Sequence, residues 1–143
     1  MSTRSMILMR YPDGKVTSAY CHWDGYPSHN GRILLDHYKT KRKVAKLLSE
    51  GDMSYLASHC DCPKGHSFEN PNRDCVCYYG RDRGEKDTGP RTHDCLEDYE
   101  DWAADGWQAY EYMFNVNDKA WYYKETFEGS GWKPLTEKVC QDD

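Results

Sequence analysis

The sequence predicts an α+β fold: an antiparallel sheet of two hairpins plus a central strand, with about three helices packed mainly on one face. Two β-prone runs flank the turn at residues 12–15, and two aromatic runs flank residues 115–119, which indicates the two hairpins. Three further segments carry apolar residues at helical spacing. The chain of 143 residues has the size of one domain, 1–143, without internal repeats.

The first hairpin is predicted to join residues 5–11 to residues 16–21. Pro12 presets φ at the turn, Asp13 can hydrogen-bond back to the backbone, and Gly14 supplies a positive φ. This turn chemistry favours two adjacent antiparallel strands.

The second hairpin is predicted to join residues 110–114 to residues 120–123. Because side chains alternate along a strand, the three aromatic residues of its first strand share one face of the sheet. Residues 75–79 have the composition of a buried strand and are placed at the centre of the sheet. A long irregular segment is expected at about 58–74, and a flexible C-terminal tail with a short edge strand within residues 132–139 is expected at the end of the chain.

Helix signals occur in three places. The first helix is expected to begin near residues 28–31, and the second has Thr40 as its N-cap and Gly51 at its end. The third is expected to run from a capping box of Asp94 and Glu97 to about residue 105. The predicted apolar stripes are, in order, Ile33, Leu34, His37 and Tyr38; Val44, Leu47 and Leu48; and Leu96, Tyr99, Trp102 and Ala103.

Charge is unevenly distributed along the chain. The net charge of −5 disfavours general binding to nucleic acids. Residues 30–50 contain six basic and two acidic residues, whereas residues 94–118 contain eight acidic residues and no Lys or Arg. This asymmetry describes either a dipolar surface that attracts a charged partner or two solvated helix faces. The candidate partner-binding residues are Glu97, Asp98, Glu100, Asp101 and Asp105.

Three observations indicate a cytoplasmic protein. The chain contains no run of about 18 apolar residues, and the apolar run at residues 6–9 is too short for the core of a signal peptide. Seven Cys is an odd number, which favours reduced thiols over a framework of disulfides.

The first polar motif, His-Trp-Asp-Gly-Tyr-Pro at residues 22–27, directly follows the first hairpin. His22, Asp24 and Tyr26 lie beside the free N–H groups at the start of a helix, which would suit a polar or anionic ligand. The alternative is structural: Asp-Gly forms a turn, Tyr-Pro restricts the chain, and Trp23 fills the core.

The second polar motif, Tyr-Gly-Arg-Asp-Arg-Gly-Glu at residues 79–85, follows the predicted buried strand. Arg81 and Arg83 alternate with Asp82 and Glu85, and two guanidinium groups can hold a phosphate or a carboxylate. Equally, the four charges can neutralise one another or anchor the long loop to the acidic helix.

Eight potential zinc ligands lie within 37 positions. The two closely spaced Cys pairs are Cys-X-Cys, whereas zinc ligands usually form knuckles with two to four intervening residues. Buried reduced thiols are therefore preferred to a structural zinc, and no metal ligand or cofactor is assigned. The eight residues are His59, Cys60, Cys62, His66, Cys75, Cys77, His93 and Cys95.

The sequence resembles a family of small proteins encoded by tailed bacteriophages and prophages. The resemblance rests on residues 20–27, 31–38, 51–52, 79–85 and 121–122, and thus covers most of the chain. It assigns no catalytic residues. The four cysteines between residues 60 and 77 lie outside the shared pattern, which counts further against zinc.

What the resemblance implies is a phage protein made in the cytoplasm of a host bacterium. We therefore expect an accessory protein that binds and inhibits or sequesters a host component, as a counter-defence inhibitor of the anti-CRISPR kind would. One alternative is a binder of a small anionic ligand such as a nucleotide. Another is a hydrolase in which Asp24, Asp82 or Glu85 holds a divalent ion, although no catalytic motif supports it.

Overall fold

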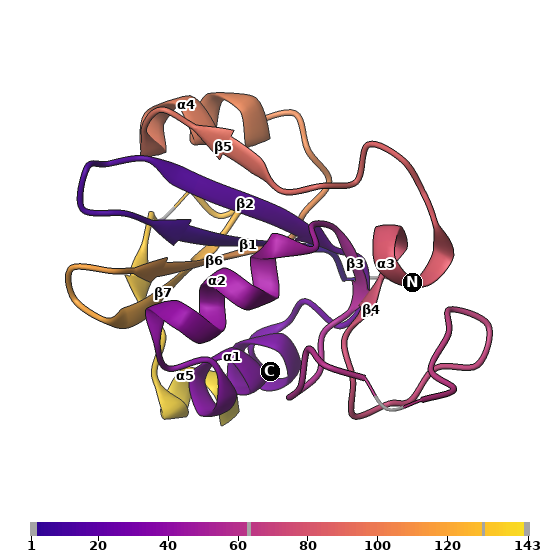
Figure 1. Ribbon diagram of the computed structural model, residues 1–143. Coiled ribbons are helices and arrows are strands. Elements are labelled where there is room, and N and C mark those ends of the chain that lie inside the picture. Colours follow the sequence, from indigo (N-terminus) through magenta and orange to yellow (C-terminus); the bar gives the residue numbers. More distant parts are fainter. Residues whose placement is uncertain (1–2, 63, 130, 142–143) are drawn as a thin grey trace.

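Within the described residues, 3–62, 64–129 and 131–141, the computed structural model has an eight-stranded mixed sheet at its centre (Figure 1). The strand order is β4-β3-β2-β1-β6-β7-β8, and β5 also pairs with β2. Helices lie beside the sheet, which confirms the predicted α+β class. The strands are β1 (Ser5–Arg10), β2 (Val16–Cys21), β3 (Met53–Tyr55), β4 (Cys77–Tyr78), β5 (Arg91–His93), β6 (Tyr110–Asn115), β7 (Ala120–Glu125) and β8 (Lys133–Pro134).

Both predicted hairpins form, but the sheet is not wholly antiparallel. β1 pairs with β2 and β6 pairs with β7 in antiparallel register, whereas β1 and β6 run parallel and place Ser5 opposite Tyr110. Five of the six residues of β1 are buried, as a strand covered on both faces requires. The strand predicted at the centre is wrong in position, because β4 lies at the edge and pairs only with the short β3.

The helices lie mainly on one face of the sheet, as predicted, with α4 on the other face (Figure 1). α1, α2 and α5 lie on one face, over a core that includes Ile7, Leu34 and Tyr112. α4 lies on the opposite face, where Tyr99 packs with Leu8. The helices are α1 (Arg32–His37), which continues from a π-helical turn at Pro27–Gly31, α2 (Lys41–Ser49), α3 (Tyr79–Arg83), α4 (Leu96–Ala103) and α5 (Glu137–Gln141).

The predicted ends are correct for α2, whereas α4 begins one residue later than predicted and ends at Ala103 instead of near residue 105. Thr40 accepts a hydrogen bond from the backbone N–H of Lys43 at 3.2 Å, and Gly51 adopts φ +79° beyond the end of α2. At α4 the N-cap is Cys95, whose sulfur accepts from the N–H of Asp98, so the expected capping box does not form.

The C-terminal segment forms regular secondary structure. β8 adds the expected edge strand beside β7. It is followed by α5, which the sequence did not predict and which buries Cys140 against the core. Residues 142 and 143 lie outside the described part of the chain.

Candidate functional site

The first motif is built into the end of the sheet by backbone hydrogen bonds. The N–H groups of His22 and Trp23 donate to the carbonyls of Met53 and Ser54, at 3.1 and 3.0 Å. At Gly25, a Cβ atom would lie 2.8 Å from the Cβ of Ser5, so only glycine fits there. The motif therefore has a structural role, which was one of the two interpretations of its sequence.

The side chains of the motif point to different partners. His22 Nδ1 lies 2.7 Å from the hydroxyl of Tyr20, and the Tyr26 hydroxyl donates to Asp24 at 3.2 Å. Burial, and then the charge of Arg4, lowers the pKa of His22, so the imidazole is favoured in its neutral form. These contacts do not bring His22, Asp24 and Tyr26 around one ligand position.

Trp23 is partly exposed, contrary to the structural interpretation of the motif, whereas Asn30 is buried. Trp23, expected in the core, is 44% exposed. Asn30 is completely buried, and its side-chain amide donates to the carbonyl of Trp23 and to the hydroxyl of Ser5, both at 3.3 Å. The only sequence signal for Asn30 was its place beside the turn that begins the first helix.

Arg81 of the second motif acts as an intramolecular clamp. Its guanidinium donates to the carbonyl of Cys60 at 2.6 Å, the carbonyl of Val76 at 2.9 Å and the carboxylate of Asp82 at 3.0 Å. It also lies 4.6 Å from the centre of the Tyr78 ring. Because these contacts occupy its donors, Arg81 fits the clamp interpretation better than the anion-site interpretation.

The remaining charges of this motif also have partners within the chain. Burial opposes ionisation of Asp82, but hydrogen bonds from Arg81 and from the N–H of Tyr78 outweigh burial and hold its pKa below the usual value. Arg83 pairs with Glu85 at 3.5 Å on the surface. The charged groups of the second motif thus bind partners within the chain and not groups of the first motif.

A cleft of about 540 Å³ lies next to the first motif, and of the seven predicted ligand-binding residues Asp24 alone lines it. Its walls come from the turn after β2, from β3 with the residue that follows it, from β4, and from the irregular segment between β3 and β4. The lining residues are Trp23, Asp24, His29, Ser54, Tyr55, Leu56, Phe68, Pro71, Arg73 and Cys77. Sequence reasoning missed most of these residues because they come from separate parts of the chain.

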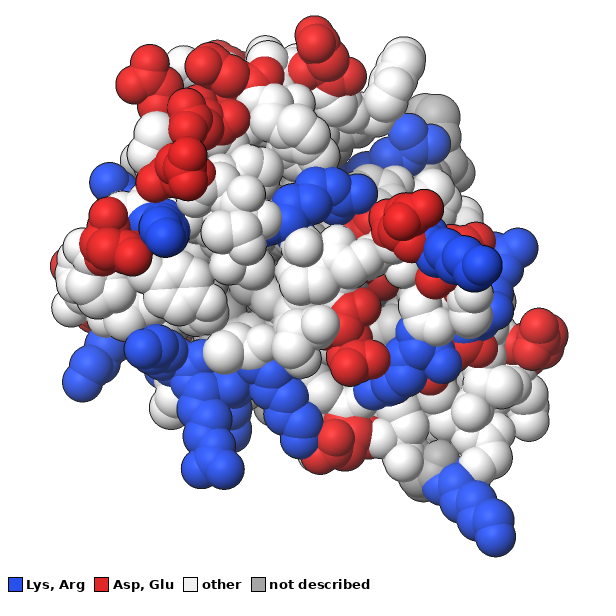
Figure 2. Space-filling view, turned by 45° about the horizontal axis from the view of Figure 1, so that its top comes forward, with Lys and Arg blue, Asp and Glu red and all other residues white. Residues whose placement is uncertain are grey.

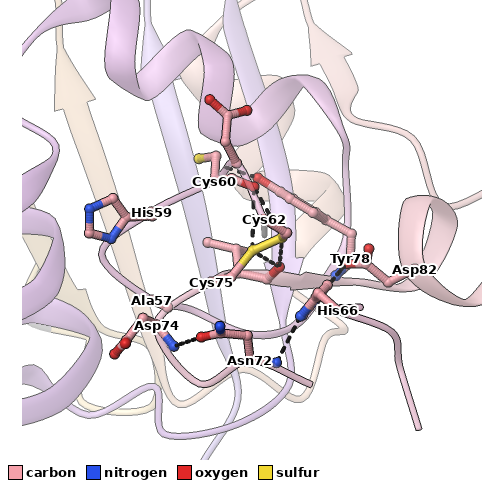
Figure 3. Close-up of a disulfide and its surroundings, with 12 residues drawn as sticks. Ala57, His59, Cys60, Cys62, His66, Asn72, Asp74, Cys75, Tyr78 and Asp82 are labelled. Carbon is pink, nitrogen blue, oxygen red and sulfur yellow. Dashed lines mark hydrogen bonds and ion pairs between the residues drawn. A yellow bond between two sulfur atoms is a disulfide. The ribbon is translucent and has the colours of Figure 1, made fainter. Parts of the chain in front are cut away.

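The eight Cys and His residues do not converge on one point. Figure 3 shows the part of the group around the disulfide, including Cys62, His66 and Cys75. Cys62 and Cys75 form a disulfide, which corrects the expectation that all thiols are reduced. His93 lies within hydrogen-bond distance of Ser18 in β2, and Cys95 caps α4. The disulfide closes the irregular segment at its base, where Arg81 also binds it.

Two groups of described residues place ligand atoms close enough for one cation: Cys62, His66 and Cys75, and His66, Cys77 and Asp82. His66 Nδ1 accepts the N–H of Asn72 at 2.9 Å, so a neutral ring carries its proton on Nε2, which faces Asp82 at 3.3 Å. That nitrogen then has no lone pair for a metal. The disulfide ties up both thiols of the first group, and burial raises the pKa of Cys77 in the second group to about 11.

The acidic residues of α4 form a separate surface. Figure 2 shows acidic side chains gathered over α4, whereas basic side chains project from the lower part of the view. Of the five predicted partner-binding residues, Glu100 pairs with Lys124 at 3.1 Å. The other four are exposed and have no ion-pair partner among the described residues: Glu97, Asp98, Asp101 and Asp105. Trp102 and Trp107 are 47% and 78% exposed on or just after the same helix.

Comparison of the chain with protein-family models, with curated proteins and with solved structures found no match. Among the described residues, no helix combines the length and the apolar character needed to cross a bilayer.

Proposed function

We propose that this protein acts by binding a partner protein through α4 and the turn that follows it. We call this region the acidic tryptophan surface and define it by Glu97, Asp98, Asp101, Trp102, Asp105 and Trp107. The observation that carries the proposal is the exposure of both tryptophans beside four carboxylates that have no ion-pair partner in the described structure. Trp102 packs against Tyr99 and lies under the guanidinium of Arg91, at 5.1 Å, but nearly half of it remains exposed. Large exposed aromatic residues are typical of interface hot spots.

The charge of this surface selects the chemistry of the partner. Carboxylates attract Lys and Arg, and the faces of indole rings bind the same cations. Proteins that bind nucleic acids present such basic surfaces. We therefore propose a partner whose basic surface normally binds nucleic acid, and which this protein would inhibit or sequester by covering that surface.

The resemblance to phage proteins supplies a biological setting for this proposal. In that setting the partner is a host protein in the bacterial cytoplasm, and the protein is a counter-defence inhibitor. A binding role is also supported over the hydrolase alternative by the contacts of the acidic residues. Asp82 is held by Arg81 and Glu85 by Arg83, while Asp24 lies in a different place, beside the cleft.

The test is affinity capture from bacterial lysate with the tagged protein, followed by competition. We expect the captured protein to be released by duplex DNA and by raising the salt concentration to about 0.5 M, because both weaken charge complementarity. Trp107→Ala and Asp101→Lys should each reduce capture about tenfold or more.

Arg42→Glu provides the matched control. Arg42 is exposed on α2, across the sheet from α4, so reversing its charge should leave capture unchanged. Capture that survives both variants of the acidic tryptophan surface, or that duplex DNA does not compete away, would contradict the proposal.

A further inference from the structure

The cleft beside the first motif contains groups that the fold does not otherwise explain. Its walls are contributed by the turn after β2, by β3 and by the segment between β3 and β4. Its volume of about 540 Å³ is within the range of roughly 300–1,000 Å³ found for small-molecule sites. The acidic tryptophan surface shares no residue with it, so the two sites are independent inferences.

Aromatic rings form the apolar part of the cleft. Trp23 is 44% exposed although it follows a buried strand, and the ring of His22 lies edge-on to it with 4.8 Å between ring centres. Tyr55 and Phe68 contribute two more half-buried rings. Phe68 packs against Tyr79, with 5.6 Å between ring centres, and the guanidinium of Arg83 lies 4.8 Å from the centre of the Phe68 ring. Rings held in this way are suited to stacking against a planar ligand.

One cation in the cleft has no carboxylate partner. The guanidinium of Arg73 lies 5.4 Å from the centre of the Tyr55 ring, and no Asp or Glu of the described segments is within ion-pair distance of it. This contrasts with Arg81, whose donors are occupied by the chain itself. Arg73 is therefore available for the anionic group of a ligand.

One anion lines the same cleft. Asp24 adopts φ 57°, a conformation that costs energy for a residue other than glycine, and its carboxylate accepts one hydrogen bond, from Tyr26. A carboxylate has about four acceptor positions, so Asp24 can also accept from hydroxyl groups of a ligand.

We propose that this cleft binds a nucleotide, with the base stacked on Trp23, the ribose hydroxyls donating to Asp24 and the phosphate bound by Arg73. A planar ring, neighbouring hydroxyls and an anionic group occur together in that class of ligand. The inference rests on the aromatic rings, on a guanidinium without a carboxylate partner among the described residues, and on a carboxylate with unused acceptor positions, all in a single cleft.

The experiment is calorimetric titration of the full chain with AMP, GMP, CMP and UMP, with each matching nucleoside and with inorganic phosphate. We expect at least one nucleotide to bind, and its nucleoside to bind about tenfold more weakly because the contact to Arg73 is lost. Inorganic phosphate alone should bind too weakly to detect, since it has no planar ring to stack against the aromatic side chains.

Three variants separate the contributions. Arg73→Gln should weaken the nucleotide about tenfold and leave its nucleoside unchanged, whereas Trp23→Ala should weaken both about 10- to 100-fold. Asp24→Asn should weaken the ribonucleotide more than its 2′,3′-dideoxy analogue. Arg42→Gln, on α2, is the control for charge and should have no effect. If Trp23→Ala unfolds, Trp23→Leu repeats the test with a variant that keeps a large apolar side chain at this position.

The proposal is overturned if none of the four nucleotides binds at about 1 mM. It is also overturned if nucleotide and nucleoside bind equally to the wild-type chain, or if Arg73→Gln and Trp23→Ala leave binding unchanged. None of these three results bears on the acidic tryptophan surface, which is tested by capture of a protein.

Discussion

The guanidinium of Arg81 binds acceptors on three parts of the chain, the carbonyls of Cys60 and Val76 and the carboxylate of Asp82. Asp82 in turn accepts from the N–H of Tyr78 and faces His66. Charged residues that look like a ligand site in the sequence therefore hold the irregular segment against α3. Charge-assisted hydrogen bonds of this kind are stronger than neutral ones, which suits a segment without regular secondary structure.

The stability of the protein should depend on the ionisation of Asp82. Its pKa is lowered in the folded state, so its contribution is present above the unfolded pKa of about 3.9 and is lost as the pH falls through the folded pKa. Asp82→Asn should lower the free energy of unfolding at pH 7 by about 1–3 kcal/mol and flatten its decline below about pH 4. Urea unfolding between about pH 2 and 7 measures both effects.

Glu85→Gln is the matched control within the same motif. Glu85 forms an exposed pair with Arg83, and surface pairs contribute about 0–1 kcal/mol. A pH dependence that is the same in Asp82→Asn as in the wild type would show that Asp82 is not the responsible group.

At the scale of elements, α4 is attached to the sheet through a buried carboxylate. Glu111 of β6 is 1% exposed and accepts from the Tyr99 hydroxyl at 2.7 Å and the Thr126 hydroxyl at 2.8 Å. Lys124 of β7 lies 3.7 Å away. Burial, and next the charge of Glu111, raises the pKa of Tyr99 far above its usual value, so its hydroxyl remains a donor.

Removing the Tyr99 hydroxyl should therefore weaken the packing of α4. Tyr99→Phe leaves the buried Glu111 without one partner and should lower the free energy of unfolding by about 1–3 kcal/mol. Tyr122→Phe is the control, because that exposed hydroxyl binds Asp118 at 2.7 Å and its loss should change stability by less than about 0.5 kcal/mol. Equal losses in the two variants, measured by chemical denaturation, would contradict this role of Glu111.

Element prediction from sequence succeeded where the signal was local. The turn at residues 12–15, the Thr40 cap and the alternation along β6 all appear as predicted. β3 was missed because it has three residues, and α5 because five residues cannot show a helical period. The cap of α4 moved from Asp94 to Cys95, a residue type that is rarely considered for this position.

At the scale of the molecule, the sheet separates two charged faces. α2 carries exposed Lys41, Arg42 and Lys43 on one side, and α4 carries its acidic residues on the other. The charge asymmetry in the sequence thus becomes an asymmetry in space, with α2 and α4 over opposite cores. Such a distribution can orient the molecule toward a basic partner before contact is made.

The two proposed sites should work independently of each other, because they share no residue. Asp101→Lys, on the acidic tryptophan surface, should leave nucleotide affinity within about twofold of the wild type, while Trp23→Ala should leave capture of the partner unchanged. Calorimetry and affinity capture with the two variants measure this. A nucleotide that releases the captured partner would show instead that the sites are coupled.

The sequence by itself determined the features that depend on neighbouring residues: the α+β class, the two hairpins, the stripe and cap of α2, and the faces of the aromatic strand. These features depend on turn chemistry and side-chain periodicity, which involve residues only a few positions apart in the sequence. Only the tertiary structure decided the parallel pairing of β1 with β6, the side of the sheet that α4 covers, and the acceptors of Arg81. It also decided the cleft around Trp23 and Arg73, because each of these features depends on contacts between residues far apart in the chain, which leave no local pattern.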